Sequence, residues 1–201
     1  MPVSGARLRS FSQMRALYTA DSGGLANALA VAVIFGVVAY LSGAFTQNSD
    51  GVATIWPANG IVLAAVILAR QPWRRHQILA LTFLANVIAN FFAHRGLATN
   101  IGFALTNTIE IYTAFHILKV RERKPYEFRN VHFLISFLIA AVVGSNIASV
   151  AAAIVTTLTI GTITWHVFTS WLFADLLGLL TVTPALVRLR QERHIPRSST
   201  G

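Results

Sequence analysis

Two carboxylates lie alone inside long uncharged and apolar stretches of the sequence. Glu110 lies between residues 96 and 118, and Asp175 lies between residues 130 and 187. An ionised carboxylate at the centre of a bilayer costs at least about 2.5–3.5 kcal/mol. A membrane chain that keeps two such groups therefore uses them for packing, for proton chemistry or for ligand contact. Two carboxylates in one cavity would suit a pH or ligand switch.

The composition indicates that these stretches belong to a membrane protein. Of the 201 residues, 55% are hydrophobic and only 11% are charged, and the mean hydropathy is +0.61. Uncharged runs, apart from the two acids, cover residues 22–49, 51–69, 76–93, 96–118 and 130–187. Each run is long enough to span about 30 Å of hydrocarbon, and the last is too long for one helix. The Thr-rich residues 156–164 are the natural place for it to turn. The sequence predicts an all-α, polytopic integral membrane helical bundle of about six transmembrane helices.

The basic residues predict the orientation of this bundle. If six helices alternate in direction, every Lys and Arg except Arg95 falls on one side of the membrane. Cytoplasmic loops carry the excess of basic residues, so we expect both termini in the cytoplasm. The expected divisions are a basic cytoplasmic arm (residues 1–21), a transmembrane domain (22–189) and a basic cytoplasmic tail (190–201). The net charge of +9 then anchors the chain to the anionic lipid of the bilayer, and no nucleic-acid partner is expected.

The sequence offers little to a metal, a cofactor or a catalytic mechanism. It has no Cys, which excludes disulfides, thiolate nucleophiles and Cys-based metal sites. His116 and His166 have no partner at metal-ligand spacing. We therefore expect no metal, no cofactor and no enzyme activity from this chain itself.

Depth along the helices places the two carboxylates at a similar level. Counted from the outer helix ends, Glu110 lies about 18 Å and Asp175 about 15 Å into the membrane. Asn107 shares a helix face with Glu110, and Trp171 and Gly178 share one with Asp175. Each carboxylate is thus expected to face its own small cluster. The cluster residues either hold helices together by hydrogen bonds or line a cavity filled by water or ligand.

Two further Asn residues support a polar interior at that level. Asn86 and Asn146 fall near mid-depth on the third and fifth predicted helices. Pro184 lies in the inner third of the last helix and is expected to bend it.

The segment that opens the second helix contains four further candidate residues. Trp56 is expected in the outer aromatic belt, and Pro57 occupies a first-turn position that needs no N–H donor. Asn59 and Gly60 follow immediately and would let another helix or a ligand approach the backbone. The free N–H groups of a helix N-terminus also attract anions.

The order of these residues resembles the MASE1 family, the membrane-associated sensor domain. The resemblance rests on Trp56-Pro57-x-x-Gly60, on Asn107-Thr108-Ile109-Glu110, and on Trp171-x-x-x-Asp175-x-x-Gly178 followed by Pro184. It implies an input module of bacterial inner-membrane signalling proteins, coupled to histidine kinase, diguanylate cyclase or cyclic-di-GMP phosphodiesterase domains. It also implies that these quoted residues are the signature positions. Sensor modules that it resembles usually act as dimers, but no heptad pattern in this sequence indicates a dimer seam, so a homodimer stays open. Two departures are the six predicted spans, where the family is commonly read with about eight, and the absence of an output domain after Arg197.

The resemblance implies a sensor that detects a small molecule, pH or a membrane-derived stimulus. The stimulus would change the packing at the membrane depth where Glu110 and Asp175 lie and would shift the last helix. That shift would act on a cytoplasmic output domain or partner protein. A small transporter or channel is the alternative, with the two carboxylates as an ion or proton relay; no predicted span is clearly discontinuous, which speaks against it. An intramembrane hydrolase would need Ser145 or Ser149 beside one of the two histidines, which lie at other depths.

Overall fold

The computed structural model confirms the all-α class. It describes residues 5–48, 52–92, 96–122, 126, 128–161 and 165–192, with side chains from residue 24 onward. The helices in this described part are α1 (Gly5–Phe45), α2 (Ala58–Leu68), α3 (Pro72–Phe91), α4 (Leu97–Arg121), α5 (Val131–Ile160) and α6 (Trp165–Glu192). Arg95, the one basic residue predicted on the outer side, lies outside the described residues.

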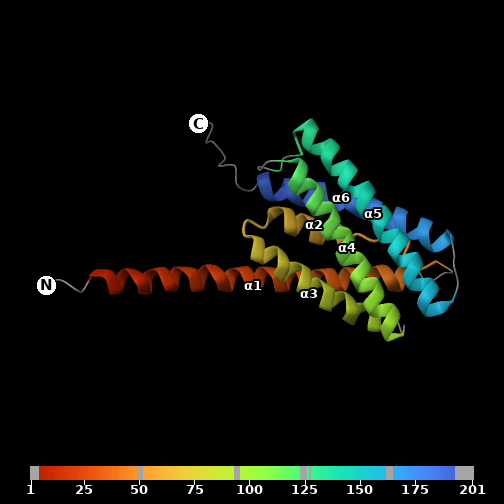
Figure 1. The fold of residues 1–201 in the computed structure, drawn as a ribbon, viewed down its shortest axis with the longest axis horizontal. Coiled ribbons are helices and arrows are strands. Elements are labelled where there is room, and N and C mark those ends of the chain that lie inside the picture. Colours follow the sequence, from red (N-terminus) through yellow and green to blue (C-terminus); the bar gives the residue numbers. More distant parts are fainter. Residues whose placement is uncertain are drawn as a thin grey trace, which may run out of the picture.

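The helices pack side by side as a bundle in which consecutive long helices run in opposite directions (Figure 1). The closest pairs are α4 with α5, α1 with α3, and α6 with both α2 and α5. The start of α1 and the end of α6 lie at the same end of the bundle, where α1 protrudes beyond its neighbours (Figure 1). The helix begins at Gly5, so residues 5–21 of the predicted basic arm are helical and continuous with the first apolar run.

The second apolar run does not form a full-length helix, and this corrects the sequence prediction. Only Ala58–Leu68 is helical, and 11 residues reach about 16 Å, half of the hydrocarbon thickness. The preceding residues form a small hairpin in which Thr54 N–H donates to Thr46 O at 2.8 Å and Asn48 N–H to Val52 O at 2.9 Å. Asn48 Nδ2 also donates to Ser170 Oγ of α6 at 2.9 Å, which attaches the hairpin to the bundle.

The two helices expected in the last run are present, and they meet within the predicted turn region. The helix α5 continues through Ile160 and ends at Gly161, whose φ of +83° is left-handed. Gly161 N–H donates to Thr157 O at 3.0 Å, a C-terminal cap that glycine adopts without strain. The turn is therefore shorter than the predicted residues 156–164, because residues 156–160 remain helical.

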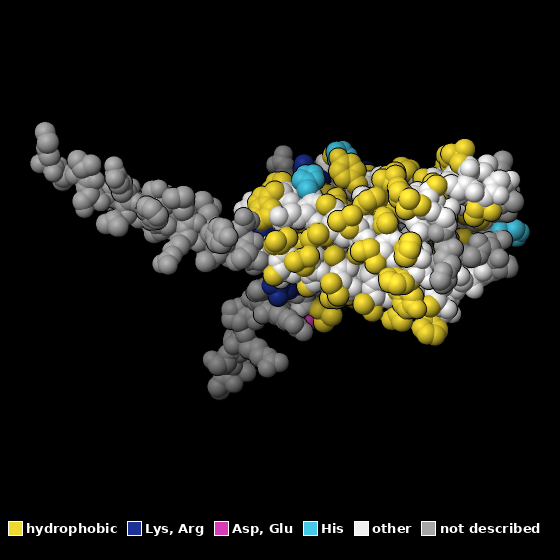
Figure 2. Space-filling model, turned by 90° about the horizontal axis from the view of Figure 1, so that it is seen from below, with side chains coloured by type: hydrophobic (Ala, Val, Ile, Leu, Met, Phe, Trp, Pro, Cys, Tyr) yellow, Lys and Arg dark blue, Asp and Glu magenta, His cyan; other side chains and the backbone are white. Residues whose placement is uncertain are grey.

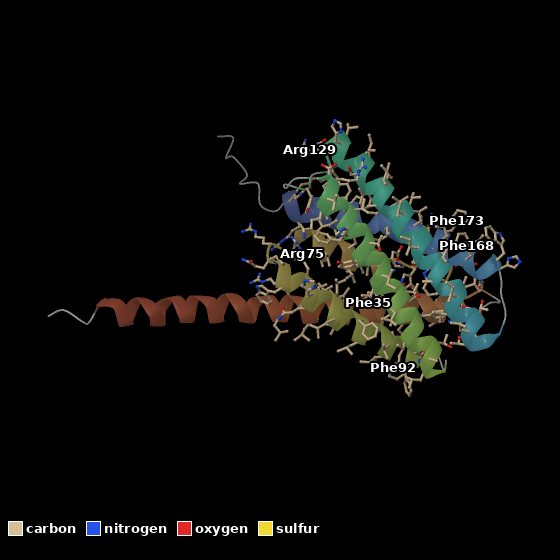
Figure 3. All side chains as sticks on the ribbon, viewed as in Figure 1. Phe35, Arg75, Phe92, Arg129, Phe168 and Phe173 are labelled. Atoms are coloured by element: carbon tan, nitrogen blue, oxygen red, sulfur yellow. The ribbon has the colours of Figure 1, made fainter. Side chains whose placement is uncertain are left out.

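The surface has an apolar band with cationic side chains at one end. Figure 2 shows hydrophobic side chains over the visible face, with Lys and Arg gathered at the end from which α1 protrudes. Arg75 and Arg129 lie toward that end and Phe168 near the other (Figure 3). Among the described residues, the helices Gly24–Phe45, Val131–Ile160 and Trp165–Glu192 are long and apolar enough to cross a membrane. The full count of six spans and the cytoplasmic position of the termini remain predictions.

Candidate functional site

Glu110 is the centre of a buried hydrogen-bonded cluster that joins three helices. Its side chain is fully buried in α4. Ser145 Oγ of α5 donates to Glu110 Oε1 at 2.6 Å, and Asn59 Nδ2 of α2 donates to Glu110 Oε2. Asn59 Nδ2 also donates to Asn107 Oδ1 at 3.0 Å. We call these four residues the Glu110 cluster; both oxygens of its carboxyl group have a protein donor.

The shared face predicted for Asn107 and Glu110 is confirmed, because Asn59 contacts both. Sequence reasoning missed Ser145 as the partner of Glu110 and had placed Asn146 in the polar interior instead. Asn146 Nδ2 donates to Val142 O of its own helix at 2.8 Å, whereas Ser145 is fully buried. The spacing of small residues on α5, with Gly144, Ser145, Ala148, Ser149 and Ala152 all buried, is the signal that identifies the inward face.

Trp56 lies deeper than the predicted outer aromatic belt. Its indole Nε1 donates to Asn59 Oδ1 at 3.2 Å, and Asn59 belongs to the Glu110 cluster near the middle of α4. The reason is the short α2: the hairpin carries the chain back into the bundle, so the helix begins at the level of Glu110. Pro57 occupies the N-cap position of α2, as expected for a residue at a helix start.

Gly60 and Gly178 allow α2 and α6 to touch through their backbones. A Cβ atom on Gly178 would lie 2.1 Å from Trp56 O, and one on Gly60 would lie 2.5 Å from Gly178 O. Thr183 Oγ1 of α6 donates to Gly60 O at 3.0 Å across the same contact. The helix N-terminus considered as a binding site is therefore packed against another helix.

Asp175 approaches the Glu110 cluster from α6. The two carboxyl groups lie within hydrogen-bonding reach of each other, a contact that requires a proton on one of them. The expectation that each carboxylate has its own separate cluster is therefore wrong. Trp171 lies one turn earlier and close to Asp175, but neither Trp171 Nε1 nor Asp175 Oδ2 completes a hydrogen bond of normal geometry.

Asp175 also lines a cavity of about 220 Å³. We call it the Asp175 cavity; it is enclosed by α1, α3, α4, α6 and the hairpin. Its lining residues are Ala39, Tyr40, Gly43, Ala44, Gln47, Val52, Ala53, Trp56, Ala89, Asn90, Phe92, Phe103, Asn107, Trp171, Ala174 and Asp175. Tyr40 and Phe92 are 49% and 60% exposed, so the cavity reaches the surface between α1 and α3. Glu110 does not line it and lies behind Asn107 and Asp175.

The remaining predicted residues lie away from this cavity. Asn86 is buried on α3 and accepts from Asn90 Nδ2 at 3.1 Å. Pro184 lies within α6, which continues to Glu192. His116 stacks on Tyr112 with ring centroids 6.0 Å apart. Among the described residues, no three His, Asp or Glu side chains converge as a metal site.

The chain matches the model of a known protein family. This is the model of the MASE1 family, which covers residues 27–199. The chain belongs to the MASE1 family. No curated protein matches it, and neither does any solved structure. MASE1 domains are membrane-associated sensory domains, so this chain is a membrane sensor domain that contacts the lipid bilayer. Within it, Trp56, Pro57, Gly60 and Gly178 form one backbone contact. Asn107 and Trp171 lie beside the carboxyl pair of Glu110 and Asp175.

Proposed function

We propose that this chain is a multi-pass sensory input module of the bacterial inner membrane, with six spans and both termini in the cytoplasm. It detects a small molecule at the Asp175 cavity, and a pH or membrane-derived stimulus would act on the same group. The observation that carries the proposal is Asp175, a buried carboxyl group that lines the cavity and whose Oδ2 has no hydrogen-bond partner of normal geometry. A buried polar atom without a partner is costly, and a ligand that donates to it recovers that cost.

The position of Asp175 also supports a route for the signal. From the cavity, α6 runs past Gly60, to which Thr183 is bonded, and ends at Glu192. Near its end, Gln191 Nε2 donates to Tyr126 O of the α4–α5 connection at 2.7 Å. A ligand that binds one position of α6 better than another shifts the helix toward that position. The displacement would reach a cytoplasmic histidine kinase or cyclic-di-GMP output domain, on the same protein or a partner.

The test measures the thermal unfolding temperature of the purified protein against pH and a metabolite panel. Wild type is compared with Asp175→Asn and with Ser149→Ala, a buried substitution outside the cavity. A ligand that binds the folded state raises the unfolding temperature. We expect a shift in wild type and Ser149→Ala that disappears in Asp175→Asn. Equal shifts in all three proteins would show that the stimulus does not act at Asp175.

One observation favours the alternative, a small transporter or channel with Glu110 and Asp175 as an ion or proton relay. It is the short helix α2, which has 11 residues and begins beside Glu110. Transporters commonly form their midplane sites from discontinuous helices. Flux into proteoliposomes that vanishes in Glu110→Gln would support transport, whereas binding without flux supports the sensor.

A further inference from the structure

The chemistry of the Asp175 cavity favours a cationic ligand. Five aromatic residues line the cavity together with the carboxyl group: Tyr40, Trp56, Phe92, Phe103 and Trp171. The rings of Phe103 and Trp171 lie in contact, with centroids 4.8 Å apart. Aromatic faces attract ammonium groups, most strongly where water is excluded. Among the described residues that line the cavity, Asp175 is the one charged-type side chain, and a carboxyl group pairs with a cation.

A second, wholly apolar groove leads into this cavity. It lies between α1 and α3, encloses about 630 Å³, and is lined along its length by Leu29, Val33, Val37, Leu81, Leu84 and Ile88. We call it the α1–α3 groove. From Leu29 to Tyr40 it extends about 16 Å, roughly half of the hydrocarbon thickness and therefore about the depth of one leaflet.

The groove and the cavity are continuous. Tyr40, Ala89 and Phe92 line both, and Phe92 lies at the end of α3 (Figure 3). Several groove residues are also open to the bilayer side of the bundle: Val33 is 64% exposed and Val37 is 55% exposed. A molecule dissolved in the membrane can therefore pass sideways from lipid into the groove, with its polar end reaching Asp175.

We propose that the Asp175 cavity and the α1–α3 groove form one site for an amphiphilic amine that enters from the bilayer. Its ammonium group pairs with the Asp175 carboxyl group among the aromatic rings, and its alkyl chain lies in the groove. This inference rests on the proposed function and names the ligand class of the same site. The sensor would then take its ligand from the bilayer.

The test measures saturable binding of labelled dodecyltrimethylammonium to the protein in phosphatidylglycerol nanodiscs, with empty nanodiscs as the correction for partitioning. Dodecanol supplies the chain without the charge, and tetramethylammonium supplies the charge without the chain. The variants are Asp175→Asn at the head-group end and Val37→Trp in the groove. Val150→Trp on α5 is the matched control, since Val150 is 51% exposed and lies outside both the groove and the cavity.

We expect saturable binding to wild type and Val150→Trp, weakened at least about tenfold in Asp175→Asn and in Val37→Trp. Unfolding temperatures without probe identify a variant that has lost its fold, and Asp175→Glu then replaces Asp175→Asn with an expected partial recovery of binding. Binding of dodecanol as tight as that of the ammonium probe would overturn the cationic head group. Equal binding of tetramethylammonium, or unchanged binding to Val37→Trp, would overturn the groove.

The outcomes also separate this inference from the sensor proposal. If a metabolite shift depends on Asp175 but the ammonium probe does not bind, the amine is wrong and the sensing site stands. If Asp175→Asn changes neither measurement, both proposals fail.

Discussion

At the scale of single residues, the site depends on how the oxygens of two carboxyl groups are satisfied. Glu110 receives donors from α2 and α5 on both of its oxygens. Asp175 lines a cavity, and its Oδ2 has no hydrogen-bond partner of normal geometry. The two acids that look equivalent in the sequence therefore differ: Glu110 is bonded to neighbouring helices, whereas Asp175 is the acid that we propose as the ligand contact.

Ser145→Ala should destabilise the protein by about 1–3 kcal/mol, because it leaves a buried oxygen of Glu110 without its donor. Ser149→Ala is the matched control on the same helix, since both serines are fully buried. Ser149 Oγ donates only to Ser145 O, a carbonyl that keeps its helical bond, so its loss should cost less than about 1 kcal/mol. Denaturant unfolding in mixed micelles measures both. Equal losses would mean that Glu110 does not depend on Ser145.

Tyr126 gives a pH dependence at the connection between α4 and α5. Burial raises the pKa of its phenol above 10.0, nearby Arg75 opposes this and Glu122 reinforces it. The folded state then holds the proton more tightly than the unfolded state. Its contribution to stability is complete below pH 10 and is lost as the pH rises through the raised pKa. Tyr126→Phe keeps the ring that stacks on Phe133 and should flatten the fall in unfolding free energy above about pH 10. An unchanged slope would contradict this assignment.

At the scale of helices, apolar length predicted where helices occur better than how long they are. The starts of α4 and α5 lie within one residue of the predicted runs, whereas α3 begins at Pro72 and includes Arg74 and Arg75, which were predicted to precede it. The error at α2 has a physical cause: residues 52–57 are uncharged, but Val52 and Thr54 pair with Asn48 and Thr46 in a hairpin, and hydropathy does not distinguish an uncharged hairpin from a helix. The helical structure of residues 5–21 was missed because these residues were assigned to a basic arm. Basic residues do not end a helix.

Gly178→Ala tests the backbone contact between α2 and α6. The added methyl would lie 2.1 Å from Trp56 O, so the helices must separate, at a cost of at least about 1–3 kcal/mol. Gly43→Ala on α1 is the control, because its nearest neighbour would be Gln47 Nε2 at 3.9 Å. Alanine at that helical position should be neutral or stabilising by about 0.5–1 kcal/mol. Thermal unfolding measures the stability of the two variants. A Gly178→Ala protein as stable as wild type would refute the close contact.

At the scale of the whole molecule, the sequence predicted the class and the family, and the structure supplied the relation between the two acids. Positions in the sequence place Glu110 and Asp175 at similar depth, but they do not state which helices are neighbours. That α2 enters beside α4 and α6, and that α1 and α3 leave a groove between them, follows from three-dimensional packing. The cavity accordingly could not be predicted from the spacing of its lining residues.

The absence of Cys from the sequence makes the proposed topology directly testable. Gln71→Cys marks the α2–α3 connection and Gly96→Cys the start of α4, and both positions are exposed. With cytoplasmic termini, a maleimide that cannot cross membranes should label Gly96→Cys in intact cells and Gln71→Cys only after lysis. The reverse pattern would invert the topology and put the tail of α6 outside the cell.

The half-length of α2 has a consequence for biosynthesis. A segment of 11 helical residues with Asn59 near its start is too short to be released into lipid by itself, and its amide finds its acceptors only on α4. The ribosome makes α4 some forty residues later. The second segment must therefore wait beside the insertion machinery or at the membrane surface until Asn107 and Glu110 arrive. We expect substitutions of Asn107 or Glu110 to lower the amount of protein that reaches the membrane. This loss acts at insertion, a step that precedes any effect on what the mature protein senses.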